Sequence, residues 1–296
     1  MTRPSPSLLL LITSIMLGSP TDLDAQIRAS ERGAVSQTVD GTTITVDYGR
    51  PQVRGRSDLF GGVVHWGEIW TPGANWATTL RVDRDVTVEG QALPAGTYSV
   101  WLEVLEGAWN AVLDPEPRRF HLMPPEESAD QVRFSLQPIT GDDEVEVLTW
   151  SFPRVRSTGT TLQLAWGRTV VKFEIQVQPS RPMTVAPEFA ARHVGRYRLR
   201  HRPPLGEKEV RFDIQYQDEH LVASWESPPN PLFAEVWLIS LGEGMFVPAL
   251  LEDGEVFDLV VDLVFEFTPL DGESRGFEVR ALGDELWGTA TRVDEP

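Results

Sequence analysis

Apolar and polar residues alternate along most of this chain, and a period of two is typical of half-buried β-strands. In residues 41–49, for example, Ile44, Val46 and Tyr48 alternate with polar residues and would share one face of a strand. The same alternation recurs at residues 80–82, 86–88, 98–104, 109–113, 132–136, 162–166 and 171–177. Glycine and proline separate many of these segments, as they do in turns. The first part of the chain therefore predicts a series of short strands.

The alternation stops in residues 178–187, where three prolines fall within ten residues. Such a segment is typical of a linker. A short helical lead-in follows, ended by Gly195, and a second series of strands comes after it, with its longest alternation at residues 259–267. We therefore expect one domain over residues 34–178, a linker over residues 179–187 and a second domain over residues 188–296.

Many short strands with frequent turns predict an all-β fold. For the first domain we expect a β-sandwich of jelly-roll-like form. For the second domain, the number of strands in so short a segment favours a small antiparallel barrel or a strongly curved sheet.

The N-terminus has the pattern of a signal peptide. Arg3 gives a positive start, residues 8–17 form an apolar run, and Ala25 stands at a plausible cleavage position. The run is too short to span a bilayer as a helix, and the alternative is a buried helix. We expect a signal peptide over residues 1–25 and therefore an exported protein, periplasmic or extracellular.

Composition narrows the possible partners. The formal net charge is −18 and the isoelectric point is near 4.7, so the surface repels phosphate backbones and anionic lipids. We expect no nucleic-acid partner, and solubility is the simplest consequence of the charge. The chain has no cysteine, which excludes disulfides, thiol catalysis and a lipid anchor on an N-terminal cysteine. No later apolar run is long enough for a transmembrane helix.

Three arginines, Arg50, Arg54 and Arg56, lie close together in this acidic chain. A guanidinium is a planar fork that suits carboxylates and phosphates, so these residues are candidates for recognition of an anion. The alternative is that they pair with nearby acids. Those acids are Asp47, Asp58 and Glu68.

Aromatic residues and an amide follow in the run WTPGANWATT. Asn75 carries a donor and an acceptor on a short side chain, and Trp66, Trp70 and Trp76 surround it in sequence. Aromatic faces beside amides and arginines suit sugar rings or other flat ligands. The alternative is that the tryptophans close the sandwich core while Asn75 caps a turn.

A second group of arginines lies at the start of the second domain. These alternate at Arg196, Arg198, Arg200 and Arg202 and would share one face of a strand. The interpretation that we favour is cross-strand pairing with acids rather than ligand binding. The acids available are Asp213, Glu207 and Glu209.

Motifs for other chemistry are missing. The five histidines do not form a metal-binding spacing, and the carboxylate pairs fall in turn-like segments. The sequence has no nucleophile elbow, phosphate-binding loop or dinucleotide-binding fingerprint. We therefore predict no catalytic residue, no metal and no cofactor.

The first domain resembles a known family. The similarity rests on DYGRP at residues 47–51, RGR at 54–56, FGG at 60–62, GEIWTPGANWATT at 67–79 and VEGQALPAGTYSVW at 88–101. These motifs, in this order, resemble the exported bacterial family known as domain of unknown function 2911. The resemblance covers roughly residues 34–177 and implies export and a β fold, but no reaction.

The second domain is similar to the small lipocalin-like barrels at the C-termini of exported hydrolases related to serine β-lactamases. The similar segments are HVGRYRL at 193–199, DEHLVASW at 218–225 and VFEFTPLDGESRGFEV at 264–279. The catalytic domain of those enzymes, with its Ser-x-x-Lys motif, has no counterpart here, so the resemblance implies no hydrolase activity.

The sequence favours an exported, non-catalytic binding or accessory protein that recognises a sugar or an anionic small ligand. The predicted site is Arg50, Arg54, Arg56, Trp66, Trp70, Asn75 and Trp76. Two alternatives stay open: a hydrolase that acts on an envelope polymer or ester, and a structural envelope protein that binds other proteins. The sequence leaves the ligand and the oligomeric state undefined.

Overall fold

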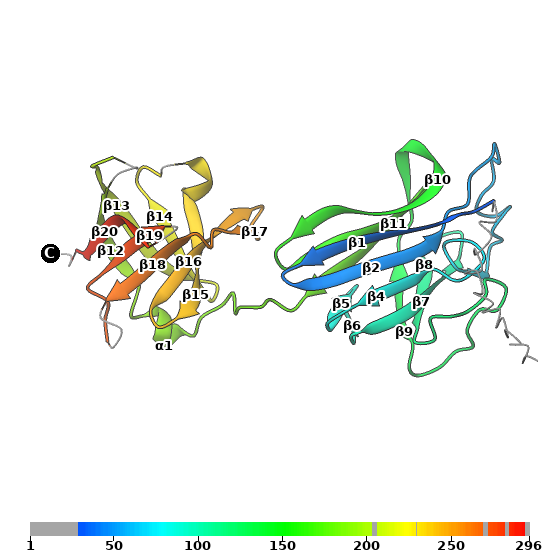
Figure 1. Cartoon of the computed structure of the whole chain (residues 1–296), viewed down its shortest axis with the longest axis horizontal. Helices are drawn as coiled ribbons and strands as arrows, with labels where there is room; N and C mark the ends of the chain where they lie inside the picture. Colours follow the sequence, from blue (N-terminus) through cyan, green and yellow to red (C-terminus); the bar gives the residue numbers. More distant parts are fainter. Residues whose placement is uncertain (1–28, 203–205, 229, 269–271, 282–283, 294–296) are drawn as a thin grey trace, which may run out of the picture.

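The computed structural model describes residues 29–202, 206–228, 230–268, 272–281 and 284–293. The predicted signal peptide, residues 1–25, lies outside the described residues. Within the described residues the strands form two groups, a sandwich and a barrel, which lie one after the other along the long axis (Figure 1). No helix in this part of the chain is long and apolar enough to cross a bilayer.

Two antiparallel sheets make the sandwich. Over the described residues, one sheet has seven strands in the order β1-β2-β4-β7-β8-β9, with β3 also paired to β7. Their bounds are β1 Arg32–Val39, β2 Thr42–Gly49, β3 Glu68–Trp70, β4 Thr79–Val82, β7 Gly96–Val104, β8 Trp109–Asp114 and β9 Val132–Leu136. The other sheet has the order β10-β11-β5-β6. Its bounds are β10 Ile139–Arg156, β11 Gly159–Val177, β5 Val86–Val88 and β6 Gln91–Leu93.

Alternation in the sequence decides which side chains face the core between these sheets. Ile44, Val46 and Tyr48 of β2 are buried, while the residues between them are partly exposed. The facing sheet supplies Trp150 and Phe173, whose ring centroids lie 5.3 Å apart. This pairing of two apolar faces is the ordinary way in which a sandwich excludes water.

The remaining strands close into an antiparallel barrel. Within the described residues the order is β15-β14-β13-β12-β20-β19-β18-β16-β17, and pairing of β15 with β16 closes the ring. The bounds are β12 Gly195–His201, β13 Glu209–Gln217, β14 His220–Trp225, β15 Glu235–Gly242, β16 Met245–Glu252, β17 Glu255–Leu259, β18 Leu263–Thr268, β19 Gly276–Ala281 and β20 Glu285–Arg292. Helix α1 (Pro187–Ala190) precedes it, and a 3₁₀ turn (Pro231–Phe233) joins β14 to β15. The predicted all-β fold, a sandwich followed by an antiparallel barrel, is confirmed.

Aromatic side chains fill the interior of the barrel. Phe212 stacks on Phe265 at 5.7 Å between ring centroids, and Phe267 lies 4.8 Å from Phe277. All four side chains are almost completely buried. The barrel is thus packed like a small protein core.

The tip of the long hairpin β10–β11 touches the barrel. Arg154 pairs with Glu255 at 2.7 Å, and Arg156 pairs with Glu252 at 2.6 Å. The Ser157 hydroxyl also donates a hydrogen bond to a backbone carbonyl of β17. One hairpin of the sandwich therefore connects the two groups of strands directly, in addition to the chain between β11 and α1.

A buried histidine lies between α1 and the barrel. His193 is 5% exposed, and its Nδ1 is 2.9 Å from the hydroxyl of Ser274. The rings of Phe189, Phe246 and Phe267 surround the imidazole. Burial lowers the pKa of His193 to about 4, and the positive charge of the adjacent arginine acts in the same direction.

This burial makes stability depend on pH. The unfolded chain takes up this proton near pH 6.5, and the folded chain does so only near pH 4. The neutral His193 therefore makes its full contribution to the free energy of unfolding above pH 6.5, and this contribution is lost as the pH falls from 6.5 to about 4. The expected loss is roughly 3 kcal/mol at most. In urea titrations from pH 7 to pH 4, His193→Gln should flatten the decline in the free energy of unfolding. The exposed His65→Gln should leave it unchanged, and equal slopes in all three proteins would contradict the assignment.

Candidate functional site

A pocket of about 440 Å³ opens where the loop after β2 meets hairpin β10–β11. Arg56, Phe60 and Trp66 line it from the loop, and Glu144 and Arg168 line it from the hairpin. Asp58 lines it as well, so the pocket combines aromatic surface, two arginines and two carboxylates from segments far apart in the sequence.

An irregular stretch of the hairpin creates this wall of the pocket. The register between β10 and β11 shifts on both sides of the pair Val145 and Gly167. Gly167 has φ +58°, a left-handed conformation that costs little only for glycine. A Cβ atom there would also lie 2.6 Å from the Leu59 side chain. The chain of β11 reverses direction here, because the Thr161 hydroxyl reaches Glu174 and the Val177 N–H reaches the Thr158 carbonyl, and glycine suits such a turn.

Arg56 is held in place by the backbone of its own loop. Its Nε donates to the carbonyl of Val53 at 2.8 Å, and a terminal nitrogen donates to the carbonyl of Gln52. The guanidinium also lies 5.7 Å from the centre of the Trp166 ring. Its orientation is therefore fixed without the use of a carboxylate.

Arg168 is held in the same manner across the pocket. One terminal nitrogen donates to the carbonyls of Gly141 and Asp142 at 3.0 and 2.9 Å. Within the described residues, neither Arg56 nor Arg168 forms an ion pair with a carboxylate. Two arginines without an ion-pair partner among the described residues therefore line one pocket, which Asp58 and Glu144 also line.

Aromatic rings of the core pack behind the wall of the pocket. Phe60 packs against Trp70, Trp109 and Trp166, with ring centroids 5.6, 4.8 and 6.0 Å away. Trp70 stacks on Trp166 at 5.8 Å, and the indole N–H of Trp166 is buried without a hydrogen-bond partner among the described residues. Trp66, in contrast, is 46% exposed and leaves much of its ring open to a ligand.

The structure brings only part of the predicted set together. Arg56 and Trp66 line the pocket, and Arg54 shares an adjoining pocket of about 280 Å³ with Arg56. Trp70 is buried in the core, as the alternative interpretation of the tryptophans held. Arg50 bonds to the carbonyl of Leu148 and the hydroxyl of Thr149 on β10. Within the described residues no ion pair joins the side chain of any of the three arginines to an acid, although the Arg54 backbone N–H donates to Glu146, so the predicted alternative of local ion pairs stays a prediction.

Asn75 and Trp76 lie apart from this pocket. The Asn75 backbone has φ +66°, and its carbonyl accepts a hydrogen bond from the backbone N–H of His121. Trp76 contacts Arg118 and Phe120 of the loop between β8 and β9. Neither residue lines the pocket, so the predicted set does not form a single site.

The predicted site lacked most of the residues that line the pocket, among them Phe60, Glu144 and Arg168. The signal that could have indicated the hairpin was Gly167, a glycine that interrupts an apolar strand. Nothing in the sequence shows which loop Gly167 faces, because that depends on the folded sandwich.

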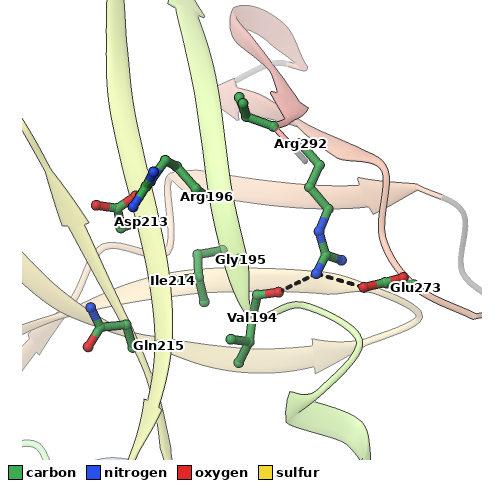
Figure 2. A pocket seen from close by; sticks show the side chains of 9 residues that line it. Val194, Gly195, Arg196, Asp213, Ile214, Gln215, Glu273 and Arg292 are labelled. Atoms are coloured by element: carbon green, nitrogen blue, oxygen red, sulfur yellow. Dashed lines mark hydrogen bonds and ion pairs between the residues drawn. The ribbon is translucent and has the colours of Figure 1, made fainter. Parts of the chain in front are cut away.

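A second pocket, of about 470 Å³, lies on the barrel (Figure 2). Arg292 pairs there with Glu273 at 2.7 Å and donates to the carbonyl of Val194, and Arg196 pairs with Asp213 at 3.4 Å. The predicted cross-strand pairing of this arginine group is thus seen with Asp213, and Arg198 and Arg200 likewise pair with Glu209. Because these cations already have acidic partners, this pocket is a weaker candidate.

Comparison with known proteins agrees with the sequence resemblance. Residues 30–175 match the model of the family described as Protein of unknown function (DUF2911). The resemblance of the first domain to that family is confirmed. No curated protein and no solved structure matched the chain. The similarity of the barrel to the hydrolase barrels therefore stays a prediction. Within the described residues, no group of three or more His, Cys, Asp or Glu side chains is placed to hold a metal.

The shape of the pocket wall should depend on Gly167. Gly167→Ala forces a side chain into a left-handed conformation and against Leu59, so we expect the free energy of unfolding to fall by about 1–2 kcal/mol. Urea denaturation measures this change. Gly107→Ala is the control, because a Cβ there meets no atom within 4 Å. Equal stabilities of the two variants would contradict the role assigned to Gly167.

Proposed function

We propose that this protein is an exported, non-catalytic binding protein whose sandwich recognises a small ligand with one anionic group and a flat ring face, such as an acidic sugar. The observation that carries the proposal is the presence of Arg56 and Arg168, neither in an ion pair with a carboxylate of the described residues, in one pocket with the exposed Trp66. Export rests on the signal-peptide pattern of residues 1–25.

The chemistry of the pocket supports this class of ligand. Each arginine has donors left over after its backbone contacts, and a guanidinium binds a carboxylate or phosphate with geometric specificity. The ring of Trp66 offers an apolar face on which a sugar or other ring can stack. Asp58 and Glu144 also line the pocket; they accept hydrogen bonds from hydroxyl groups and repel ligands with several negative charges.

Binding can be measured with a panel that separates these features. The panel contains glucuronate and galacturonate, the neutral sugars glucose and galactose, and acetate, which has a charge but no ring. A ligand of the native state raises the melting temperature by mass action, and calorimetry then gives its affinity. We expect the acidic sugars to bind, and the neutral sugars and acetate to bind more weakly.

Substitutions in the pocket test where the ligand binds. Arg56→Gln and Arg168→Gln should each weaken binding about tenfold or more, because each removes a charge-assisted hydrogen bond. Arg81→Gln removes an exposed arginine of β4 outside the pocket and should leave binding unchanged. A panel without binding, or equal losses in all three variants, would contradict the proposal. Cleavage of a glycoside or ester of the bound compound would favour the hydrolase hypothesis.

A further inference from the structure

A second surface of the sandwich has the composition of a protein-binding site. It consists of Trp76, Arg118, Phe120, Leu122 and Met123, and we call it the Trp76 platform. The four apolar side chains are 41, 36, 73 and 65% exposed. Phe120 meets Trp76 edge to face at 5.7 Å, and the Arg118 guanidinium lies 4.9 Å from the centre of the Trp76 ring.

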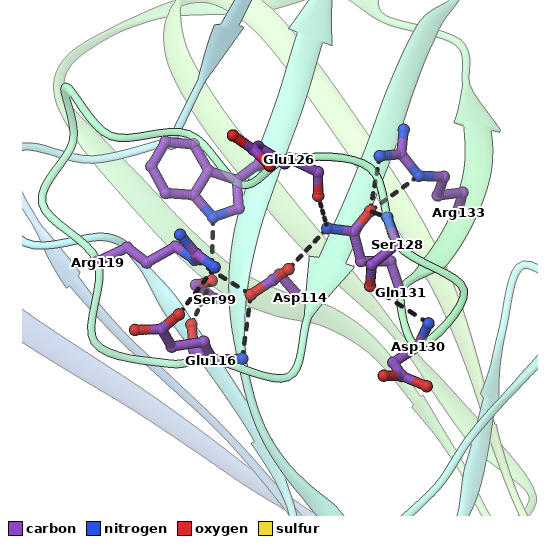
Figure 3. Close-up of polar contacts among 10 residues, drawn as sticks. Ser99, Asp114, Glu116, Arg119, Glu126, Ser128, Asp130, Gln131 and Arg133 are labelled. Carbon is purple, nitrogen blue, oxygen red and sulfur yellow. Dashed lines mark hydrogen bonds and ion pairs between the residues drawn. The ribbon is translucent and has the colours of Figure 1, made fainter.

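The loop that carries the platform is anchored by a buried carboxylate (Figure 3). Asp114, at the end of β8, is 4% exposed and accepts hydrogen bonds from the Glu116 N–H, Arg119 Nε and Gln131 Nε2 at 3.0, 3.2 and 2.7 Å. These contacts fix both ends of residues 115–131. The fully buried Ser99 adds a hydrogen bond to the carbonyl of Glu116.

The middle of the loop is tied to the segment before β4. The Ala77 N–H donates to the Arg119 carbonyl, and the His121 N–H donates to the Asn75 carbonyl, both at 2.8 Å. Together with the Asp114 contacts, these bonds hold a long loop in one conformation. A partner that binds the platform therefore pays little conformational entropy to order it.

The composition of the platform indicates a protein as the partner. Tryptophan, phenylalanine, methionine and arginine are the residue types enriched at protein interfaces and among their energetic hot spots. None of the pockets described above includes a residue of the platform, whereas small ligands prefer concave sites. Trp76 contacts Phe120, and the exposed Leu122 and Met123 follow within three residues in the same loop; a group of exposed apolar residues of this kind is the pattern of an interaction site.

Charge indicates what kind of protein surface fits. Arg119 pairs with Asp114 and Glu116, and Arg32 pairs with Asp47, but no carboxylate of the described residues pairs with Arg118. The uncompensated charge of the platform is thus positive, on a chain whose net charge is −18. A complementary surface places an acidic side chain against Arg118 and apolar side chains against Trp76 and Met123.

We infer that the Trp76 platform docks an acidic, apolar segment of another protein, independently of ligand binding in the pocket of Arg56 and Arg168. This function goes beyond the proposed recognition of a small ligand, because the two surfaces share no residue.

The test uses a labelled synthetic peptide in which aspartate and leucine alternate, with a second peptide in which lysine replaces each aspartate. We expect fluorescence anisotropy to show binding of the acidic peptide only. Trp76→Ala should weaken binding tenfold or more, and so should the paired change Leu122→Ser and Met123→Ser, whose exposed side chains the fold does not need. Trp66→Ala removes a comparably exposed tryptophan of the pocket and should have no effect.

A further variant tests the anchoring of the loop. Asp114→Asn substitutes no residue of the platform but weakens the hydrogen bonds that anchor its loop. It should therefore weaken peptide binding with little change in the circular dichroism spectrum. Absence of binding by the acidic peptide, or equal binding of both peptides, would overturn the inference. It would also be overturned if Trp76→Ala abolished binding to anionic lipid vesicles, or abolished a dimer in sedimentation, without affecting peptide binding.

Discussion

The contact of four aromatic rings, Phe60, Trp70, Trp109 and Trp166, connects the parts of the sandwich on which its candidate pocket depends. Trp70 and Trp109 come from the seven-stranded sheet, Trp166 from the facing sheet and Phe60 from the loop after β2. Rings of this size remove large apolar areas from water, and their edge-to-face contacts add a preferred geometry. The cluster therefore joins the two sheets and also positions the loop that carries Arg56.

Electrostatics in the pocket follows from how the arginines are held. Several arginines of the described residues pair with carboxylates, as Arg119, Arg280 and Arg292 do. Arg56 and Arg168 are held by backbone carbonyls instead, which orient a guanidinium without cancelling its charge. A backbone carbonyl accepts a hydrogen bond but carries no net charge, so the positive charge of the guanidinium stays available to an anion. The sequence does not show which arginines bind carboxylates and which bind backbone carbonyls.

Local periodicity was enough to predict the strands and the all-β class, because a half-buried strand must alternate. Ile44, Val46 and Tyr48 face the core for that reason alone. The candidate site was predicted only in part, since proximity in sequence does not determine proximity in a sandwich. Trp66, Trp70 and Trp76 lie within one run, yet one lines the pocket, one is buried and one belongs to another surface. The partners Phe60 and Arg168 are more than a hundred residues apart and meet only through the fold. Whether the barrel had a hollow interior was likewise undecided until Phe212, Phe265 and the neighbouring rings were seen to fill it.

The hairpin β10–β11 lines the pocket at one end and contacts the barrel at the other. Near its base, Gly167 and Arg168 form a wall of the pocket, and at its tip Arg154 and Arg156 contact the barrel. Successive side chains of a strand point to opposite faces, so the loss or gain of one residue between these points would turn every later side chain to the wrong face. Evolution can therefore change the length of the surface loops much more freely than the length of this hairpin. Among relatives that have both the sandwich and the barrel, insertions and deletions should be rare between Gly167 and the tip.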